Sequence, residues 1–483
     1  VRAYGENFPG AAEPTVRSAA LTFAVEDRQK VWNAGFFVQN VFDIQDKYFI
    51  TGGVRVDGNS AFGEGFGLQA YPKVSAVWVV SDENFWADAL GSVKLRAAYG
   101  QSGRAPGAFD AVRTWTPAGF AGLPAFTPSN LGNADLGPEV TAEYEFGFDG
   151  SWLNDRLTST FTYYNQTTTD ALMNVSAIPS SGFTASQLRN VGEVGNRGIE
   201  FQVNGSVFQS QDWGVDLGLG ITTNNSEVIS LCSDPDDDAT CIAEFSDLNG
   251  RIIEGYPAPV QWDKRVANPE AVSGDWAYAC NDADPENGVL YPTLTDVGDG
   301  TCRDNVPIGP QLPTHFVSPN ITLRVPGNIT LSARGEYRGG MVAEIAPIPV
   351  GRSVRSAICF PYYVGPAGEA TGTSATLELR PDTPDLWRER CTPSGADDNW
   401  FDADYFKLRA VSASIPMDFA FPDRVSNATL TLTLQNAWSW YREIPYYDAE
   451  VQGNNAATDD GIGGQSERIP SPATFRMSLR VTF

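Results

Sequence analysis

Side chains that could carry covalent or metal chemistry are few in this sequence. Its 483 residues include one histidine, His315. Zinc sites and Ser-His-Asp triads need imidazoles in number or beside other reactive groups, so a lone histidine argues against both. The six cysteines form no C-x-x-C pair, which disfavours a zinc ribbon or a dithiol redox motif. We therefore expect that this protein is not an enzyme.

The 59 Asp and Glu residues give the chain a net charge of −26. This acidity argues against nucleic acid as a partner, because phosphate binding needs a positive face. Two acidic stretches could bind calcium, which prefers clustered carboxylates in flexible loops. They are CSDPDDDATC, with Asp234, Asp236, Asp237 and Asp238, and NDADPENG, with Asp282, Asp284 and Glu286. Neither has the spacing of an EF-hand, so solvated acidic loops are the favoured interpretation and no cofactor is assigned.

The elements that would position these residues are β-strands. No stretch approaches 18 uninterrupted apolar residues, so transmembrane helices are not expected. Apolar residues instead alternate with polar ones, as Leu430, Leu432 and Leu434 alternate with threonines. About fourteen strands are predicted, near 20–26, 32–42, 47–57, 70–80, 93–100, 140–150, 157–167, 197–208, 213–222, 315–325, 329–339, 404–415, 428–435 and 474–483.

The connections between these strands alternate in length. Short or medium ones lie at 43–46, 81–91, 153–156, 210–212, 326–328 and 416–427, and long ones near 58–69, 102–139, 168–196, 225–314, 340–403 and 439–473. Tight turns at one end and long loops at the other are typical of outer-membrane barrels, whereas a soluble sandwich gives no reason for the alternation. Only the hairpin near 27–31 breaks the pattern. We predict an all-β fold, an antiparallel transmembrane β-barrel, as a single domain over 1–483.

The two faces of the predicted strands differ in character. Aromatic residues near strand ends fit the interfacial girdles of such barrels, and these are Trp32, Tyr48, Trp78, Tyr99, Trp152, Trp213, Trp438 and Trp440. Basic residues on the face opposite the apolar one would line a polar lumen, and these are Arg55, Lys94, Arg96, Arg324, Arg334, Arg476 and Arg480. Hydration of the lumen is favoured for them over guidance of an anionic or sugar ligand.

Several segments in order along the chain resemble the SusC/RagA-type TonB-linked outer-membrane proteins, a branch of the TonB-dependent receptors. They are DKYFITGGVRVDGNSAFG at 46–63, YPKVSAVWVVSDENFW at 71–86, VKLRAAYGQSG at 93–103, NADLGPEVTAEYEFGFDGSWLNDRLTSTFTYYNQTTTDALM at 133–173, NVGEVGNRGIEF at 190–201, GYPAP at 255–259, DYFKLRAVSASIPM at 404–417, the pair Gln435–Asn436 and the terminal SPATFRMSLRVTF. In the fifth, Asn190, Gly192, Asn196, Gly198 and Glu200 match the family pattern. Segments 225–314 and 340–403 do not match it well, so the substrate stays open.

The resemblance implies TonB-dependent import, across the bacterial outer membrane, of a nutrient too large for porins, an oligosaccharide or an oligopeptide. Implied partners are outer-membrane lipid, TonB–ExbB–ExbD acting through a plug domain, the barrel-assembly machinery and a SusD-like lipoprotein over the loops. Barrels of the family have 22 strands and a plug. Because neither the plug nor the first strands are found here, we expect a portion of a longer chain rather than a free-standing fourteen-stranded barrel.

Two other classes of function fit parts of the pattern. One is a structural or adhesive outer-membrane barrel that transports nothing, which the lack of a plug in the full reading frame would favour. The other is a secreted β-rich binding module or enzyme, which the alternation of connections and the single histidine disfavour. Extraction without detergent would identify the secreted class.

The cysteines and the last residue carry two further predictions. All six cysteines lie in segments 225–314 and 340–403, and pairing within a segment leaves three of 15 arrangements. Neighbour pairing closes the shortest loops, so we predict Cys232–Cys241, Cys280–Cys302 and Cys359–Cys391 over free thiols. Resemblance to outer-membrane proteins implies that Phe483 is the C-terminal aromatic of an assembly signal.

Overall fold

A computed structural model gives the structure of the chain. It describes residues 2–6, 16, 19–25, 30–63, 67–120, 123–176, 186–232, 241, 245–247, 250–263, 306–344, 362, 380–391, 400–417, 427–443, 448, 450 and 471–482.

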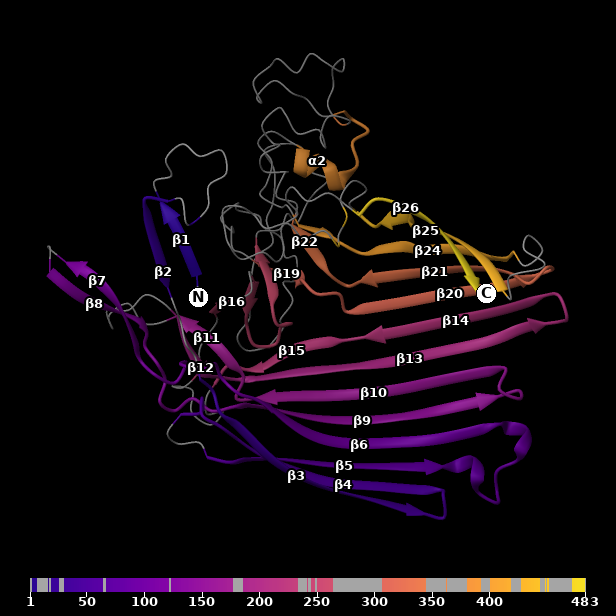
Figure 1. Cartoon of the computed structure of the whole chain (residues 1–483), viewed down its shortest axis with the longest axis horizontal. Helices are drawn as coiled ribbons and strands as arrows, with labels where there is room; N and C mark the ends of the chain where they lie inside the picture. The colour runs from indigo at the N-terminus through magenta and orange to yellow at the C-terminus, as the bar shows by residue number, and fades with distance from the viewer. Residues whose placement is uncertain are drawn as a thin grey trace.

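One antiparallel sheet of 14 strands organises the molecule (Figure 1). Its continuous path, which we call the wall, runs in chain order from β3 to β26. The wall strands are β3 (Asn33–Ile44), β4 (Tyr48–Asn59), β5 (Gln69–Val79), β6 (Ser92–Arg104), β9 (Glu139–Trp152), β10 (Leu157–Thr169), β13 (Glu193–Gln209), β14 (Gly214–Thr223), β20 (His315–Val325), β21 (Ile329–Gly339), β24 (Tyr405–Pro416), β25 (Asn427–Tyr441) and β26 (Thr474–Thr482). The remaining strand, β15 (Asn225–Ser230), pairs with the loop end of β13.

The predicted strand near 20–26 is confirmed as a strand, but it lies outside the wall. It exists as β2 (Leu21–Val25), but it pairs with β1 (Arg2–Glu6) in a separate two-stranded sheet. Alternation within a segment predicts a strand but not its partner. Because β2 lies outside the wall, the short connection near 27–31 no longer breaks the alternation of turns and loops.

Tight turns gather at one end of the wall, to the right in Figure 1. Gln45 and Asp46 between β3 and β4 have positive φ, and so do Asn154 and Asp155 between β9 and β10. Asn and Asp tolerate this left-handed backbone better than other residues with side chains, which suits them to short hairpin loops. The two short 3-10 helices η2 (Val80–Asp82) and η3 (Asp88–Leu90) also lie at this end, between β5 and β6.

The long connections lie at the opposite end and contain folded elements of their own (Figure 1). These are β7 (Thr114–Phe120), β8 (Leu123–Asn130), β11 (Leu172–Ser176), β12 (Ser186–Asn190), β16 (Phe245–Asp247), β17 (Gly250–Ile252), β18 (Val260–Asp263), β19 (Val306–Pro310), β22 (Val342–Glu344), β23 (Trp400–Asp402) and α2 (Asp385–Cys391). Among the described residues, no helix has the length and apolarity needed to cross a membrane.

Register separates the wall into two chemically different faces. On the first, Val38 faces Val54, Ala97 faces Phe146 and Leu432 faces Met477, and apolar residues continue across every strand. On the second, polar groups predominate, as where Thr431 opposes Ser478, although Phe37 and Phe49 of the first two strands also lie on it. We call these the apolar face and the polar face.

Buried side chains concentrate at the loop end of the wall rather than behind it. Val228, Leu231 and Ile252 form one small core, with Met173 and Ala258 packed against it. Met341, Ala403 and Tyr405 form another. By contrast, many large apolar residues of the wall are exposed, including Phe36 at 79% and Met477 at 70%. The wall is therefore a single layer with its apolar face uncovered by the described chain.

Candidate functional site

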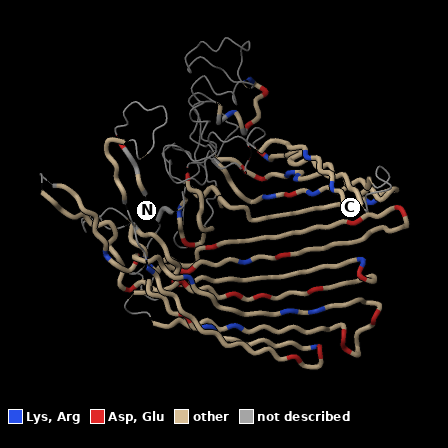
Figure 2. Tube along the Cα trace, in the orientation of Figure 1, with Lys and Arg blue, Asp and Glu red and all other residues tan. Residues whose placement is uncertain are grey.

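The seven basic residues expected in the lumen all lie on the polar face. Arg55 pairs with Asp57 at 2.7 Å, and Arg96 pairs with Asp149 at 3.2 Å. Arg334 lies opposite Asn320, and Arg476 lies opposite Thr433. Because they are spread from β4 to β26, these residues do not gather into one site. Figure 2 shows the charged residues distributed along the strands and at the tight turns.

A group of carboxylates that the sequence analysis did not single out occupies the polar face of β9 and β13. Glu143 and Glu145 lie on β9, and Glu200 lies two strands away on β13. A cavity of about 360 Å³ is lined by Glu143 and Glu145 together with Lys73, Tyr99 and Gln101. Their signal in the sequence is the alternation in AEYEFGFDG, where every acidic residue falls on the same side of the strand.

The densest ionic contacts lie at the loop end of β21 and β24. Lys407 is only 3% exposed, and its Nζ contacts Asp448 Oδ1 at 2.5 Å and Glu450 Oε2 at 2.6 Å. Arg409 bonds both oxygens of Glu450, with Nη1 2.8 Å from Oε2 and Nη2 bonded to Oε1. Glu336 accepts from Arg409 Nε at 3.0 Å. We call Glu336, Arg338, Lys407, Arg409, Asp448 and Glu450 the charge cluster.

Glu450 is the centre of the charge cluster. Besides Lys407 and Arg409, it accepts a hydrogen bond from Tyr405 Oη at 2.8 Å. Burial works to raise the pKa of Glu450, but the hydrogen bonds from Arg409, Lys407 and Tyr405 outweigh it and hold the pKa well below its usual range. Glu450 is therefore ionised at neutral pH.

A second group of charges joins the loop ends of three wall strands. Asp404 accepts from Tyr337 Oη and from the backbone N–H of Gly340, both at 2.7 Å, and from Arg442 Nη1 at 3.1 Å. Arg442 Nη1 also lies 3.0 Å from Asp402 Oδ2. These contacts connect the end of β21, the start of β24 and the end of β25. We call the group of Asp402, Asp404 and Arg442 the aspartate hub.

The two carboxyls of the aspartate hub titrate differently. Burial and the neighbouring negative charge of Asp404 raise the pKa of Asp402 to about 6, although Arg442 opposes the shift. Burial also works against ionisation of Asp404, but hydrogen bonds from Tyr337 and Gly340 lower its pKa overall. A close pair of carboxyls separates its pKa values in this way when one of them receives most of the donors.

In the segment 190–201, which matches the family pattern, Asn190 and Gly198 have structural roles. The Asn190 side chain bonds Gly137 in both directions, accepting from its N–H at 2.7 Å and donating to its carbonyl at 3.0 Å. A Cβ on Gly198 would lie 1.9 Å from the carbonyl oxygen of Thr223, so only glycine fits there. Asn190 and Gly198 thus help to hold the strands and loops together.

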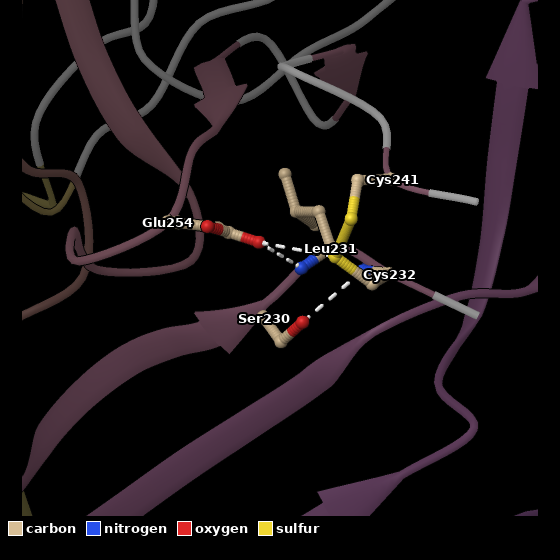
Figure 3. The surroundings of a disulfide bond; sticks show 5 residues. All are labelled: Ser230, Leu231, Cys232, Cys241 and Glu254. Atoms are coloured by element: carbon tan, nitrogen blue, oxygen red, sulfur yellow. Dashed lines mark hydrogen bonds between the residues drawn. A yellow bond between two sulfur atoms is a disulfide. The ribbon is translucent and has the colours of Figure 1, made fainter. Parts of the chain in front are cut away.

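Cys232 and Cys241, one of the predicted pairs, are joined by a disulfide in the β14–β20 loop (Figure 3). The bridge lies beside Leu231, whose side chain is fully buried and whose N–H donates to Glu254 Oε1 at 2.5 Å. Cys391 is also disulfide-bonded. It ends α2, and its predicted partner Cys359 lies outside the described residues.

Several predicted site residues lie outside the part of the chain that the structure describes. These are the calcium candidates Asp234, Asp236, Asp237, Asp238, Asp282, Asp284 and Glu286, the cysteines Cys280 and Cys302, and the terminal Phe483. Their roles stay predictions.

An antiparallel wall with one apolar and one polar face, tight turns at one end and folded loops at the other, defines the class of outer-membrane β-barrels. A comparison with protein families identifies the family within this class. The family described as TonB dependent receptor-like, beta-barrel matches residues 2–338, and the chain belongs to this family.

Individual relatives agree with this assignment. TonB-dependent receptor P26 of Formosa agariphila is 27% identical over 474 residues, which cover 93% of this chain and 46% of that protein. TonB-dependent receptor SusC of Bacteroides thetaiotaomicron is 27% identical over 249 residues, which cover 47% and 23% respectively. A chain of the RagAB peptide transporter superposes with a TM-score of 0.73 at 17% identity, covering 98% of this chain and 50% of that one. The chain thus spans about half the length of the relatives it matches along most of its own length.

Proposed function

We propose that this chain forms part of a bacterial outer-membrane importer that moves a large nutrient, an oligosaccharide or an oligopeptide, through the space beside the polar face. The observation that carries the proposal is the division of the wall into two faces. An apolar face that the described chain leaves uncovered suits hydrocarbon, and a polar face bearing arginines, glutamates and threonines suits a hydrated path. Binding and gating suffice for transport, so the proposal invokes no covalent chemistry.

The family supports specific partners for the complete protein. Outer-membrane lipid would cover the apolar face. TonB–ExbB–ExbD would act on a plug domain of the complete protein, and the barrel-assembly machinery would insert the protein. A SusD-like lipoprotein over the loop end is supported by the relative named SusC and by the likeness to a chain of a transporter named RagAB.

Uptake by whole cells tests the proposal. The gene for the full-length protein is deleted and restored in cells with and without TonB, and accumulation of labelled oligosaccharide and oligopeptide mixtures is followed. We expect one mixture to enter only when both the protein and TonB are present. Uptake that is unchanged by the deletion, with loss of surface attachment instead, would identify a structural or adhesive barrel.

A further inference from the structure

The side chains that the wall strands contribute to the charge cluster carry a net positive charge. Arg338, Lys407 and Arg409 project from β21 and β24 onto the polar face, where Glu336, the carboxylate of the same two strands, pairs with Arg338 and Arg409. Three cations against one carboxylate leave an excess of two positive charges. Lys407 is almost fully buried, and a buried ammonium group is strongly destabilising without a partner.

The excess is neutralised by two residues from a different part of the chain. Asp448 and Glu450, which follow β25, bring two negative charges, and they are 41 and 43 residues from Lys407 in sequence. Both residues contact the wall cations through their side-chain carboxylates, Asp448 binding Lys407 and Glu450 binding Lys407 and Arg409. Arg409 holds Glu450 with two parallel N–H···O bonds, the geometry by which guanidinium groups recognise free carboxylates.

We propose that Arg338, Lys407 and Arg409 form a binding site for an acidic peptide on the polar face, and that Asp448 and Glu450 occupy this site as a built-in substitute. The site is fitted to two carboxylates one residue apart, because that is the segment it holds. The segment is itself a peptide, which favours an oligopeptide over an acidic oligosaccharide. Displacement of these two carboxylates would expose the three cations to cargo, so the inference rests on the proposed import and specifies its substrate class.

Tyr405 and Tyr441 complete the site without adding charge at neutral pH. Tyr405 Oη donates to Glu450, and its ring lies 5.3 Å below Lys407 Nζ. Tyr441 packs against Tyr405 with ring centroids 6.4 Å apart. These rings limit access of water to the ion pairs, which strengthens the attraction for whichever carboxylates are bound.

The test removes the built-in carboxylates and offers replacements. The full-length protein carrying D448N/E450Q is purified in detergent, and binding of rhodamine-labelled acetyl-Asp-Ala-Glu-amide is measured by fluorescence anisotropy. We expect at least ten-fold tighter binding than for the unmodified protein, weakening between 50 and 300 mM salt, and no comparable gain for the Asn-Ala-Gln peptide. The matched control D382N/D385N removes two exposed carboxylates beside α2 and should leave peptide binding unchanged.

Further variants keep the result decisive. Adding K407M/R409M to D448N/E450Q should abolish the gained affinity. Unboiled electrophoretic mobility reports whether each variant is folded, and if the double variant is not, E450Q alone should still bind the peptide more tightly than the unmodified protein. Equal affinity of variant and unmodified protein, a gain that survives K407M/R409M, or tighter binding of a trimeric oligogalacturonate than of the peptide would overturn the proposal. Binding without cellular uptake would instead keep this site and overturn import.

Discussion

At the scale of single residues, the aspartate hub contains two neighbouring carboxyls whose pKa values shift in opposite directions. Asp402 and Asp404 share Arg442 within about one hydrogen-bond length each, and burial removes water that would otherwise separate their charges. The carboxyl with fewer donors must lose its proton last. This explains why the pKa of Asp402 rises to about 6 while that of Asp404 falls.

The raised pKa of Asp402 predicts a pH-dependent weakening of the loop end. Because the folded pKa lies above the unfolded value of about 4, the ionised form is the costly one in the folded protein. Stability from this residue is therefore complete below about pH 4 and is lost as pH rises through 6. Asp402→Asn should slow hydrogen exchange of residues 400–404 at pH 7.5, by an amount equivalent to about 1 kcal/mol after allowing for solvent screening, and have little effect at pH 4.5.

Asp382→Asn provides the control for this pH experiment. Asp382 pairs with Arg380 on an exposed surface, so its replacement should leave the exchange of 400–404 unchanged at both pH values. If Asp402→Asn speeds exchange equally at pH 4.5 and 7.5, its carboxyl acts only as a hydrogen-bond acceptor and the titration argument is wrong.

The charge cluster could not have been predicted from the sequence. Lys407 and Arg409 stand in an alternating segment like those of other wall strands, and nothing in the sequence distinguishes them from residues such as Arg334. Their partners Asp448 and Glu450 lie beyond the next strand, in a stretch where no periodic pattern specifies contacts. Long-range ion pairs depend on how loops return to the wall, which alternation does not encode.

At the level of elements, the sequence specified strands well because each wall strand has two different environments. Side chains on one face meet apolar neighbours, and those on the other meet polar groups, so a period of two persists along the strand. The small loop elements such as β17 and β22, of three residues each, are too short to show a period. Ile252 of β17 is part of one small core, and Ala343 of β22 packs against the core that contains Met341. These contacts stabilise the two short strands.

The facing of β25 predicts unequal effects for two adjacent residues. Leu432 lies between Ala413 and Met477 on the apolar face, and Thr431 lies between Ser414 and Ser478 on the polar face. Leu432→Arg should cost about 2–4 kcal/mol if it lies at the bilayer midplane, because it places a charge in hydrocarbon. Thr431→Arg should cost much less. Folding titrations of both full-length variants in liposomes give the comparison, and equal costs would mean that the apolar face does not contact lipid.

The Cys232–Cys241 disulfide should stabilise its loop locally. Its closed loop has a sequence separation of nine residues, for which restriction of the unfolded chain contributes about 2–3 kcal/mol. We expect C232S/C241S to increase proteolysis of the β14–β20 loop while unboiled electrophoretic mobility, which reports the wall, stays unchanged. A reductant should increase loop cleavage in the unmodified protein more than in the variant. Equal cleavage of both proteins without reductant would show that the small core around Leu231 holds the loop unaided.

For the whole molecule, the separation of turns from loops implies a fixed orientation across the membrane. Asp46 lies in the tight turn between β3 and β4, and Leu123, 69% exposed, begins β8 at the opposite end. In barrels of this class the short turns face the periplasm and the long loops face the exterior. A reagent that cannot cross the outer membrane should therefore reach residues in the long loops and fail to reach residues in the tight turns.

Variants of the full-length protein that each carry one added cysteine test this orientation. L123C should react with a membrane-impermeant maleimide on intact cells, and D46C should react only after the outer membrane is permeabilised. The unmodified protein gives the background labelling to be subtracted, since Cys232, Cys241 and Cys391 are paired in disulfides and the other three cysteines are predicted to be paired. Asn154, in the tight turn between β9 and β10, supplies an independent site, and N154C should behave like D46C. Labelling of both turn variants on intact cells would place the turns outside the cell. The loop end, with the charge cluster, would then face the periplasm, and a ligand from outside would meet the turn end first.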